Sequence, residues 1–235
     1  MQLSLKKKEF QFLLQSLGAI HDTCVLELRE DGIHGIASSD DNSMFAHAYL
    51  SGEYENQNLN LPSLKKLSKA LDMISSDDIK LKLNNNHLEY KDKSLKFKYH
   101  LHEDGVITKP KLSLEKIRNF EYNLQFDLDF DFLSNVLQKS SITNTKKLYL
   151  FTENDSLVWK LGDETVPNSD TLSIVGDEVD FELESFILKI DNLKLLSKVS
   201  KTGNIFKINS KLGVGCIITK SGDFEMEYIL SSLKN

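Results

Sequence analysis

The sequence predicts an α+β fold built from two similar domains, and three observations support this prediction. Short segments with alternating apolar residues, typical of half-buried antiparallel strands, recur along the chain. Four other segments carry apolar residues at helical spacing, each leading into further strand-like segments. Leu59 and Leu64 also match Leu188 and Leu193 at one constant offset, which indicates an internal repeat.

The composition is that of an ordinary globular protein. Its 235 residues allow one large domain or two small ones, and 40% of them are hydrophobic, too many for a disordered chain. No apolar run approaches the roughly 20 residues of a membrane span, and no signal peptide is recognisable, so we expect a cytoplasmic protein. Cys24 and Cys216 lie far apart in apolar segments and are predicted to be buried free thiols.

The first domain, predicted over residues 1–108, contains two strand–helix–three-strand units. Ser63 precedes the second helix and is placed to cap it. The apolar faces of the two helices comprise Phe10, Leu13, Leu14 and Leu17, and Leu64, Leu67, Leu71 and Ile74. The expected elements are strand 2–5, helix 6–20 and strands 23–30, 32–39 and 44–50, then strand 57–61, helix 64–74 and strands 78–85, 87–93 and 95–101.

A connector containing glycine and proline is predicted near the midpoint, over residues 109–120, and a second domain over 121–235. Leu133, Val136 and Leu137 supply the apolar face of the third helix. The expected elements are strand 122–129, helix 130–142 and strands 146–154, 156–163 and 171–175, then a helix within 188–201 and strands 207–210, 213–222 and 224–230.

Lysines gather on the polar faces of the predicted helices, although the formal net charge of the chain is −6. Acidic residues cluster elsewhere, as in GDEVDFELE, so we expect basic helices and acidic strands and loops. One basic side suits a polyanion held on that side. The candidate DNA-binding residues are Lys7, Lys8, Lys65, Lys66, Lys69, Lys139, Lys194, Lys198 and Lys201.

Double-helical DNA is the ligand that these lysines favour. Ammonium groups on phosphates recognise charge rather than base sequence. No aromatic platform for stacking unpaired bases is interleaved with them. The competing interpretation is that each row of lysines is an ordinary solvated helix face that binds nothing.

The doubled domain, the four units, the lysine-bearing helices and the midpoint connector together resemble the DNA sliding clamps, especially the trimeric phage and proliferating-cell-nuclear-antigen type. The segment LELREDGIHGIASSDDNSMFAHAYL is similar to a clamp strand pair that flanks a short Ser/Asp turn. The closing GDFEMEYIL is similar to the final clamp strand. The resemblance covers essentially all 235 residues.

The resemblance implies a non-enzymatic processivity factor without a cofactor. It implies a closed ring around double-stranded DNA, with antiparallel sheets outside and helices on the inner face. A chain of two domains implies a homotrimer. The implied partners are the replicative DNA polymerase and a clamp-loader ATPase, which must be a separate protein because this chain has no Walker-type G-x-x-x-x-G-K-[ST] motif. A phage clamp would act in the host cytoplasm.

The resemblance also implies an apolar pocket for a short partner peptide, between the domains and beneath the connector. The competing interpretation is that the residues concerned belong to the ordinary core. The candidates for this pocket are Ile36, Met44, Val106, Ile107, Leu112, Tyr228 and Leu230.

Three other functions stay open. A monomeric processivity factor of the same fold would hold DNA on an open basic face, and a scaffold would bind protein only. A metal-dependent nuclease would use the alternating Asp127, Asp129 and Asp131. These acids straddle a predicted strand–helix junction, where a carboxylate can cap the helix instead. No G-x-S-x-G or G-x-G-x-x-G motif is present, and we predict neither a catalytic site nor a metal site.

Overall fold

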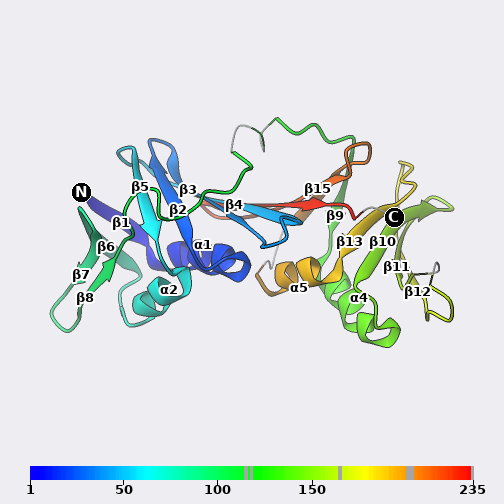
Figure 1. Ribbon diagram of the computed structural model, residues 1–235, viewed down its shortest axis with the longest axis horizontal. Coiled ribbons are helices and arrows are strands. Elements are labelled where there is room, and N and C mark those ends of the chain that lie inside the picture. The colour runs from blue at the N-terminus through cyan, green and yellow to red at the C-terminus, as the bar shows by residue number, and fades with distance from the viewer. Residues whose placement is uncertain (114–115, 117–118, 164–165, 200–203, 234–235) are drawn as a thin grey trace. The chain divides into compact units, whose positions relative to one another are not determined.

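The computed structural model describes residues 1–235 except 114–115, 117–118, 164–165, 200–203 and 234–235. The chain forms two compact units (Figure 1). The first comprises Met1–Arg118 together with Lys220–Met226, and the second comprises Asn119–Thr219 together with Glu227–Asn235. Part of the predicted connector therefore lies outside the described residues.

The first unit contains two antiparallel sheets, with strand orders β1-β6-β7-β8 and β5-β2-β3-β4. Helix α1 (Lys7–Ile20) follows β1, and helix α2 (Leu64–Asp72) follows β5. The strands are β1 (Gln2–Lys6), β2 (Cys24–Arg29), β3 (Gly32–Ser38), β4 (Met44–Ser51), β5 (Gln57–Leu61), β6 (Asp78–Asn84), β7 (His87–Lys91) and β8 (Lys96–His100).

The second unit contains sheets with strand orders β12-β11-β10-β13 and β16-β15-β14-β9. Helix α4 (Phe130–Thr143) follows β9, and helix α5 (Ile190–Val199) follows β13. The strands are β9 (Leu124–Leu128), β10 (Lys147–Glu153), β11 (Ser156–Leu161), β12 (Leu172–Glu178), β13 (Phe186–Lys189), β14 (Asn204–Asn209), β15 (Val214–Ser221) and β16 (Phe224–Ser231).

The described elements follow the order strand, helix and three strands four times, which confirms the predicted α+β class and its four units. The boundaries differ slightly from the expected ones. Helix α2 ends at Asp72 rather than Ile74 because the chain tightens there. The N–H groups of Met73 and Ile74 donate to the carbonyl groups three residues earlier, at 3.3 and 3.0 Å, as in a 3₁₀ turn.

The predicted helix faces form the core of the first unit. The four predicted core residues of α1 are fully buried, and those of the α2 segment are at most 1% exposed. Gly18 lets the two helices approach closely, because a Cβ atom there would lie 3.3 Å from the Cβ of Leu64. The side chains on the other side of α2 are consequently turned toward solvent.

Both cysteines are buried and free, as predicted. Burial raises the pKa of the Cys24 thiol to about 12, so this thiol stays protonated and packs as an apolar group. None of the described helices combines the length and the hydropathy that a membrane crossing requires.

Candidate nucleic-acid interface

Helix α2 presents three lysines to solvent from a well-capped N-terminus. The Ser63 hydroxyl oxygen accepts a hydrogen bond from the backbone N–H of Lys66 at 3.1 Å, as predicted. Asp22 accepts a second one from the N–H of Lys65 at 2.9 Å. Lys65, Lys66 and Lys69 are exposed, and none forms an ion pair with a described residue. Their ammonium groups are therefore available to an external anion.

The polar side of helix α1 faces α2 in part. Gln11 donates hydrogen bonds to the carbonyl oxygen of Ser68 at 3.2 Å and to the Asp72 carboxylate at 2.7 Å. Gln15 donates to the Ser68 hydroxyl at 3.2 Å. These bonds satisfy the polar groups that the crossing of the helices would otherwise desolvate.

The two candidate lysines of α1 have different surroundings. Lys7 is half-buried, and its ammonium group donates to the carbonyl oxygen of Ile74 at 2.6 Å, just beyond the end of α2. Lys8 is exposed, with its ammonium group 3.9 Å from the Asp77 carboxylate. Lys7 thus joins two elements of the fold, whereas Lys8 extends the basic surface of the helices.

The helices of the second unit carry fewer described lysines. Lys139 on α4 is half-buried, and Lys194 on α5 is exposed. The side chain of Lys198 lies outside the described part of the structure, and so does the whole of Lys201.

The alternating acids do not assemble a metal site. Asp129 accepts a hydrogen bond from the N–H of Asp131 at 2.8 Å and thereby caps helix α4. Asp127 and Asp129 line a cavity with acidic residues of β12, yet no described group of three or more His, Cys, Asp or Glu residues is placed to hold an ion.

The predicted division of charge is wrong for the sheet β1-β6-β7-β8. Strands were expected to be acidic, but alternation turns the apolar residues of these four strands inward and the lysines outward. The register aligns Lys82 with Glu89 and Glu89 with Lys98 on the solvent side. We call this surface the lysine face; its charged residues are Lys6, Lys80, Lys82, Lys91, Lys96, Lys98, Asp78 and Glu89.

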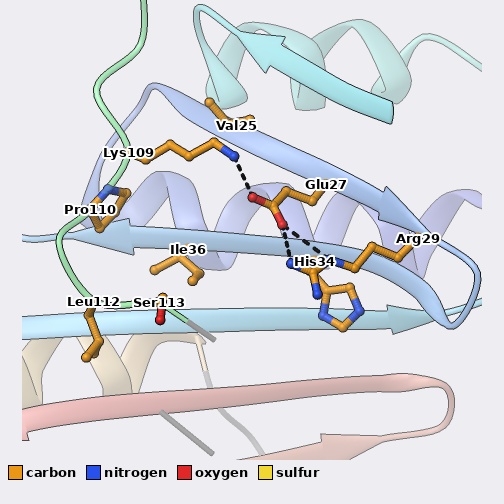
Figure 2. A pocket seen from close by; sticks show the side chains of 9 residues that line it. All are labelled: Val25, Glu27, Arg29, His34, Ile36, Lys109, Pro110, Leu112 and Ser113. Carbon is orange, nitrogen blue, oxygen red and sulfur yellow. Dashed lines mark hydrogen bonds and ion pairs between the residues drawn. The ribbon is translucent and has the colours of Figure 1, made fainter. Parts of the chain in front are cut away.

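A cavity of about 280 Å³ lies within the first unit, between the start of the connector and the sheet β5-β2-β3-β4 (Figure 2). Strand β2 contributes alternate residues to it, and the connector contributes the segment from Lys109 to Ser113. Its lining combines an apolar part with a charged part and comprises Val25, Glu27, Arg29, His34, Ile36, Lys109, Pro110, Leu112 and Ser113.

Glu27 anchors the connector to the sheet. It accepts hydrogen bonds from the Lys109 ammonium group at 2.6 Å and from the Arg29 guanidinium group at 2.6 and 3.2 Å (Figure 2). Burial alone would raise the pKa of Glu27, but the bonds from Lys109 and Arg29 outweigh it and lower the pKa. The carboxylate therefore stays ionised and holds one end of the connector in place.

A buried histidine pair lies beside this cavity. His34 is 1% exposed, and its ring nitrogens lie 3.2 Å from Nε2 of His47 and 3.0 Å from the Asp31 carboxylate. Burial lowers the pKa of His34, and the nearby Asp31 opposes this effect only in part. The neutral ring is favoured in the folded chain.

The structure separates the seven candidates for the peptide pocket. Ile36 and Leu112 line the cavity of Figure 2, and Ile36 and Ile107 line a neighbouring one in the same unit. Val106 is 59% exposed and lines neither of these two. The other three candidates are at most 1% exposed and are core residues: Met44, Tyr228 and Leu230.

Sequence reasoning missed the charged part of this cavity. Glu27, Arg29 and Lys109 were not singled out, because Lys109 is far from Glu27 in the sequence. The alternation of Val25, Glu27 and Arg29 along β2 was the available signal, since it places all three on one side of the sheet.

The repeated units with their antiparallel sheets and single helices define the DNA clamp fold. No protein-family model matches the sequence, and no curated protein matches it. Solved structures do match. The chain superposes on A. fulgidus PCNA, solved with the C-terminal region of FEN-1 bound, with a TM-score of 0.78 at 14% identity, covering 100% of this chain and 98% of that one.

Two further solved structures match the chain in the same way. PCNA from Thermococcus kodakaraensis gives a TM-score of 0.77 at 14% identity and 99% coverage of both chains. The DnaN sliding clamp (DNA polymerase III subunit beta) from Pseudomonas aeruginosa, bound to griselimycin, gives 0.80 at 12% identity, covering 100% of this chain and 66% of that one. The chain therefore has the fold of the sliding clamps. It spans nearly the whole length of the PCNA chains and about two thirds of the bacterial chain.

Proposed function

We propose that the protein is a sliding clamp, a ring of three copies that encircles double-stranded DNA and tethers the replicative DNA polymerase. The observation that carries this proposal is the match to PCNA along 99–100% of this chain and 98–99% of the PCNA chains, because it extends to every unit of the fold. Such a protein acts as a processivity factor and not as an enzyme. It would act in the cytoplasm, that of the host if a phage encodes it.

The exposed lysines of α2 supply the DNA contact in this proposal. Lys65, Lys66 and Lys69 form no described ion pair, so their charge is free to attract phosphates. Long, mobile side chains over a phosphate backbone bind weakly, without sequence preference and with strong dependence on salt. A protein that slides along DNA needs this kind of contact.

The outer edges of two sheets supply the contact between copies. Strand β8 ends one sheet of the first unit with Lys96 and Lys98, and strand β12 ends one sheet of the second unit. Exposed acids occupy the end of β12 and the segment after it: Asp177, Glu178, Asp180, Glu182 and Glu184. Opposite charges on two unpaired edges favour joining β8 of one copy to β12 of the next.

The internal repeat supports the same joint. Strand β16 closes its strand–helix–three-strand unit as β8 closes the second one. Phe224 and Met226 of β16 are buried in the chain, whereas Leu95 and Phe97, beside and within β8, are only half-buried. A second copy seated against this edge would complete their burial, and three such joints would close a ring of two-unit chains.

The cavity beneath the connector supports a site for partner peptides. Val25, Ile36 and Leu112 form its apolar part, and Glu27 with Lys109 borders it (Figure 2). The structure of A. fulgidus PCNA with the C-terminal region of FEN-1 provides a precedent for a peptide on this fold. We propose that the polymerase, and a separate clamp-loader ATPase, use the corresponding site here.

Processive synthesis by the cognate polymerase on a primed circular template tests the proposal. We expect the Lys65→Gln/Lys69→Gln variant to reduce stimulation about tenfold at moderate salt, because two phosphate contacts per copy are lost. Ile36→Arg should abolish stimulation while leaving DNA association intact, because it places a charge in the apolar cavity.

The control is Lys207→Gln/Lys211→Gln, which removes the same charge from the second unit away from the helices. Circular dichroism should show that all variants are folded. Undiminished stimulation by the α2 variant, or no stimulation by the parent protein, would contradict the proposed function.

A further inference from the structure

The lysine face carries an unbalanced positive charge. The described strands β1, β6, β7 and β8 place six lysines and two carboxylates on it. Lys6 forms an ion pair with Asp78 at 2.6 Å, and Lys96 forms one with Glu89 at 3.2 Å. Both carboxylates are therefore already neutralised by lysines of the same face.

The remaining lysines have no such partner. Lys80, Lys82 and Lys91 are exposed, and none of them forms an ion pair with a described residue. Neighbouring strands lie about 4.8 Å apart, and alternate residues of one strand about 6.6 Å apart. The six lysines and two carboxylates thus share one continuous patch, which has a surplus of four positive charges.

The equivalent sheet of the second unit has a different solvent side. The sheet β12-β11-β10-β13 also places lysines there, Lys147, Lys160 and Lys189, but Tyr149, Phe151 and Val175 share that side with them, and Val175 is 66% exposed. The same architecture therefore carries a mixed apolar and basic surface in the second unit and a surface without large apolar side chains in the first.

The chemistry of the face favours a phosphate backbone over a protein. Protein interfaces are enriched in aromatic residues, methionine and arginine, and are depleted in lysine. The solvent side of this sheet has lysines but no arginine, methionine, phenylalanine, tyrosine or tryptophan in its described strands. Without aromatic rings it also lacks the stacking platform of a single-strand binder, so duplex DNA fits best.

We propose that the lysine face is a second DNA-contact surface, which holds the backbone of a duplex that does not pass through the ring. The contact is independent of base sequence and acts through Lys80, Lys82 and their neighbours. It does not depend on ring formation, because all of its residues belong to one sheet of one unit.

The test is binding of a fluorescent, covalently closed duplex minicircle, measured by anisotropy over a range of salt without a clamp loader. A preassembled ring cannot thread such a circle, so this probe favours contacts outside the hole. We expect Lys80→Gln/Lys82→Gln to weaken binding about tenfold and to reduce the slope of log affinity against log salt by about 2, because each phosphate contact contributes about 0.9.

Three matched variants separate the causes. Lys80→Arg/Lys82→Arg keeps the charge and should retain parental affinity. Lys207→Gln/Lys211→Gln controls for net charge and should bind the minicircle as the parent does. Lys65→Gln/Lys69→Gln removes the contact of the proposed hole and should weaken binding of the minicircle less than Lys80→Gln/Lys82→Gln does. Loss of binding only in the α2 variant would place the contact on the helices and overturn the inference.

An unchanged salt slope in Lys80→Gln/Lys82→Gln would also overturn it. So would tighter binding of poly-glutamate than of duplex DNA at equal charge, since an acidic protein would then be the better ligand. Failure of the proposed clamp appears separately, as a loss of polymerase stimulation by the parent protein.

Discussion

Single side chains join the start of the connector to the sheet beneath it. Glu27 bonds to Lys109 and Arg29, and the buried His34 lies next to His47 and Asp31. A charged network and the buried His34 thus adjoin the cavity that we assign to partner peptides. Burial lowers the pKa of His34, so its charge state can be followed by a simple measurement.

We expect the protein to lose stability as the pH falls from 7.5 to 5.5, and His34→Gln to lose less. Burial lowers the pKa of His34 in the folded chain below its usual value of 6.5. The unfolded chain therefore binds the proton first, and the free energy of unfolding decreases as the pH falls through 6.5 toward the folded pKa. Urea unfolding at several pH values measures this, with the exposed His21→Gln as control. Parallel curves for parent and His34→Gln would refute it.

The roles of residues that bond to near neighbours in the sequence were predictable, and the roles of residues that bond to distant parts of the sequence were not. The caps Ser63 and Asp129 could be inferred because each bonds within three residues of its own position. Lys7 was assigned to DNA from its helix alone, whereas its ammonium group bonds to Ile74, 67 residues away in sequence. A sequence reveals which side of a helix is polar but not which other element lies against it.

At the scale of elements, apolar spacing predicted the helices and strands well, because burial selects one face of each. The charge of the strands was misjudged because acids and lysines were counted by segment and not by face. In β6, Lys80 and Lys82 alternate with Ile79 and Leu81, so both lysines point to solvent together. The same alternation, read strand by strand, would have predicted the lysine face.

A substitution in the edge strand β12 tests the proposed joint between copies. We expect Val175→Lys to convert the proposed trimer into a monomer of 26.8 kDa, because it adds a positive charge opposite the lysines of β8 in the proposed joint. Val166→Lys, at another exposed valine of the same unit, should leave the assembly unchanged. Light scattering after size-exclusion chromatography distinguishes the two results. A parent protein that is monomeric at all concentrations would refute the joint itself.

At the scale of the whole molecule, the internal repeat predicted the doubled architecture, but not which segments each unit recruits. The hairpin tip Lys220–Met226 belongs to the first unit, where Phe224 packs edge-on against Phe12 with ring centroids 4.8 Å apart. Ser51 also donates its N–H to the carbonyl oxygen of Asp223 at 3.0 Å. Contacts between segments so far apart follow from the folded topology and carry no local signal in the sequence.

In the proposed function the ring holds DNA by topology, because it encloses the duplex. The most direct measurement assembles the protein on a nicked circular plasmid, cross-links it mildly, and follows its retention by gel filtration in high salt before and after the plasmid is linearised. If the ring encloses DNA, the protein stays on the circular plasmid in high salt and is released once the plasmid has free ends. Equal retention, or equal loss, on circular and linear DNA would contradict it.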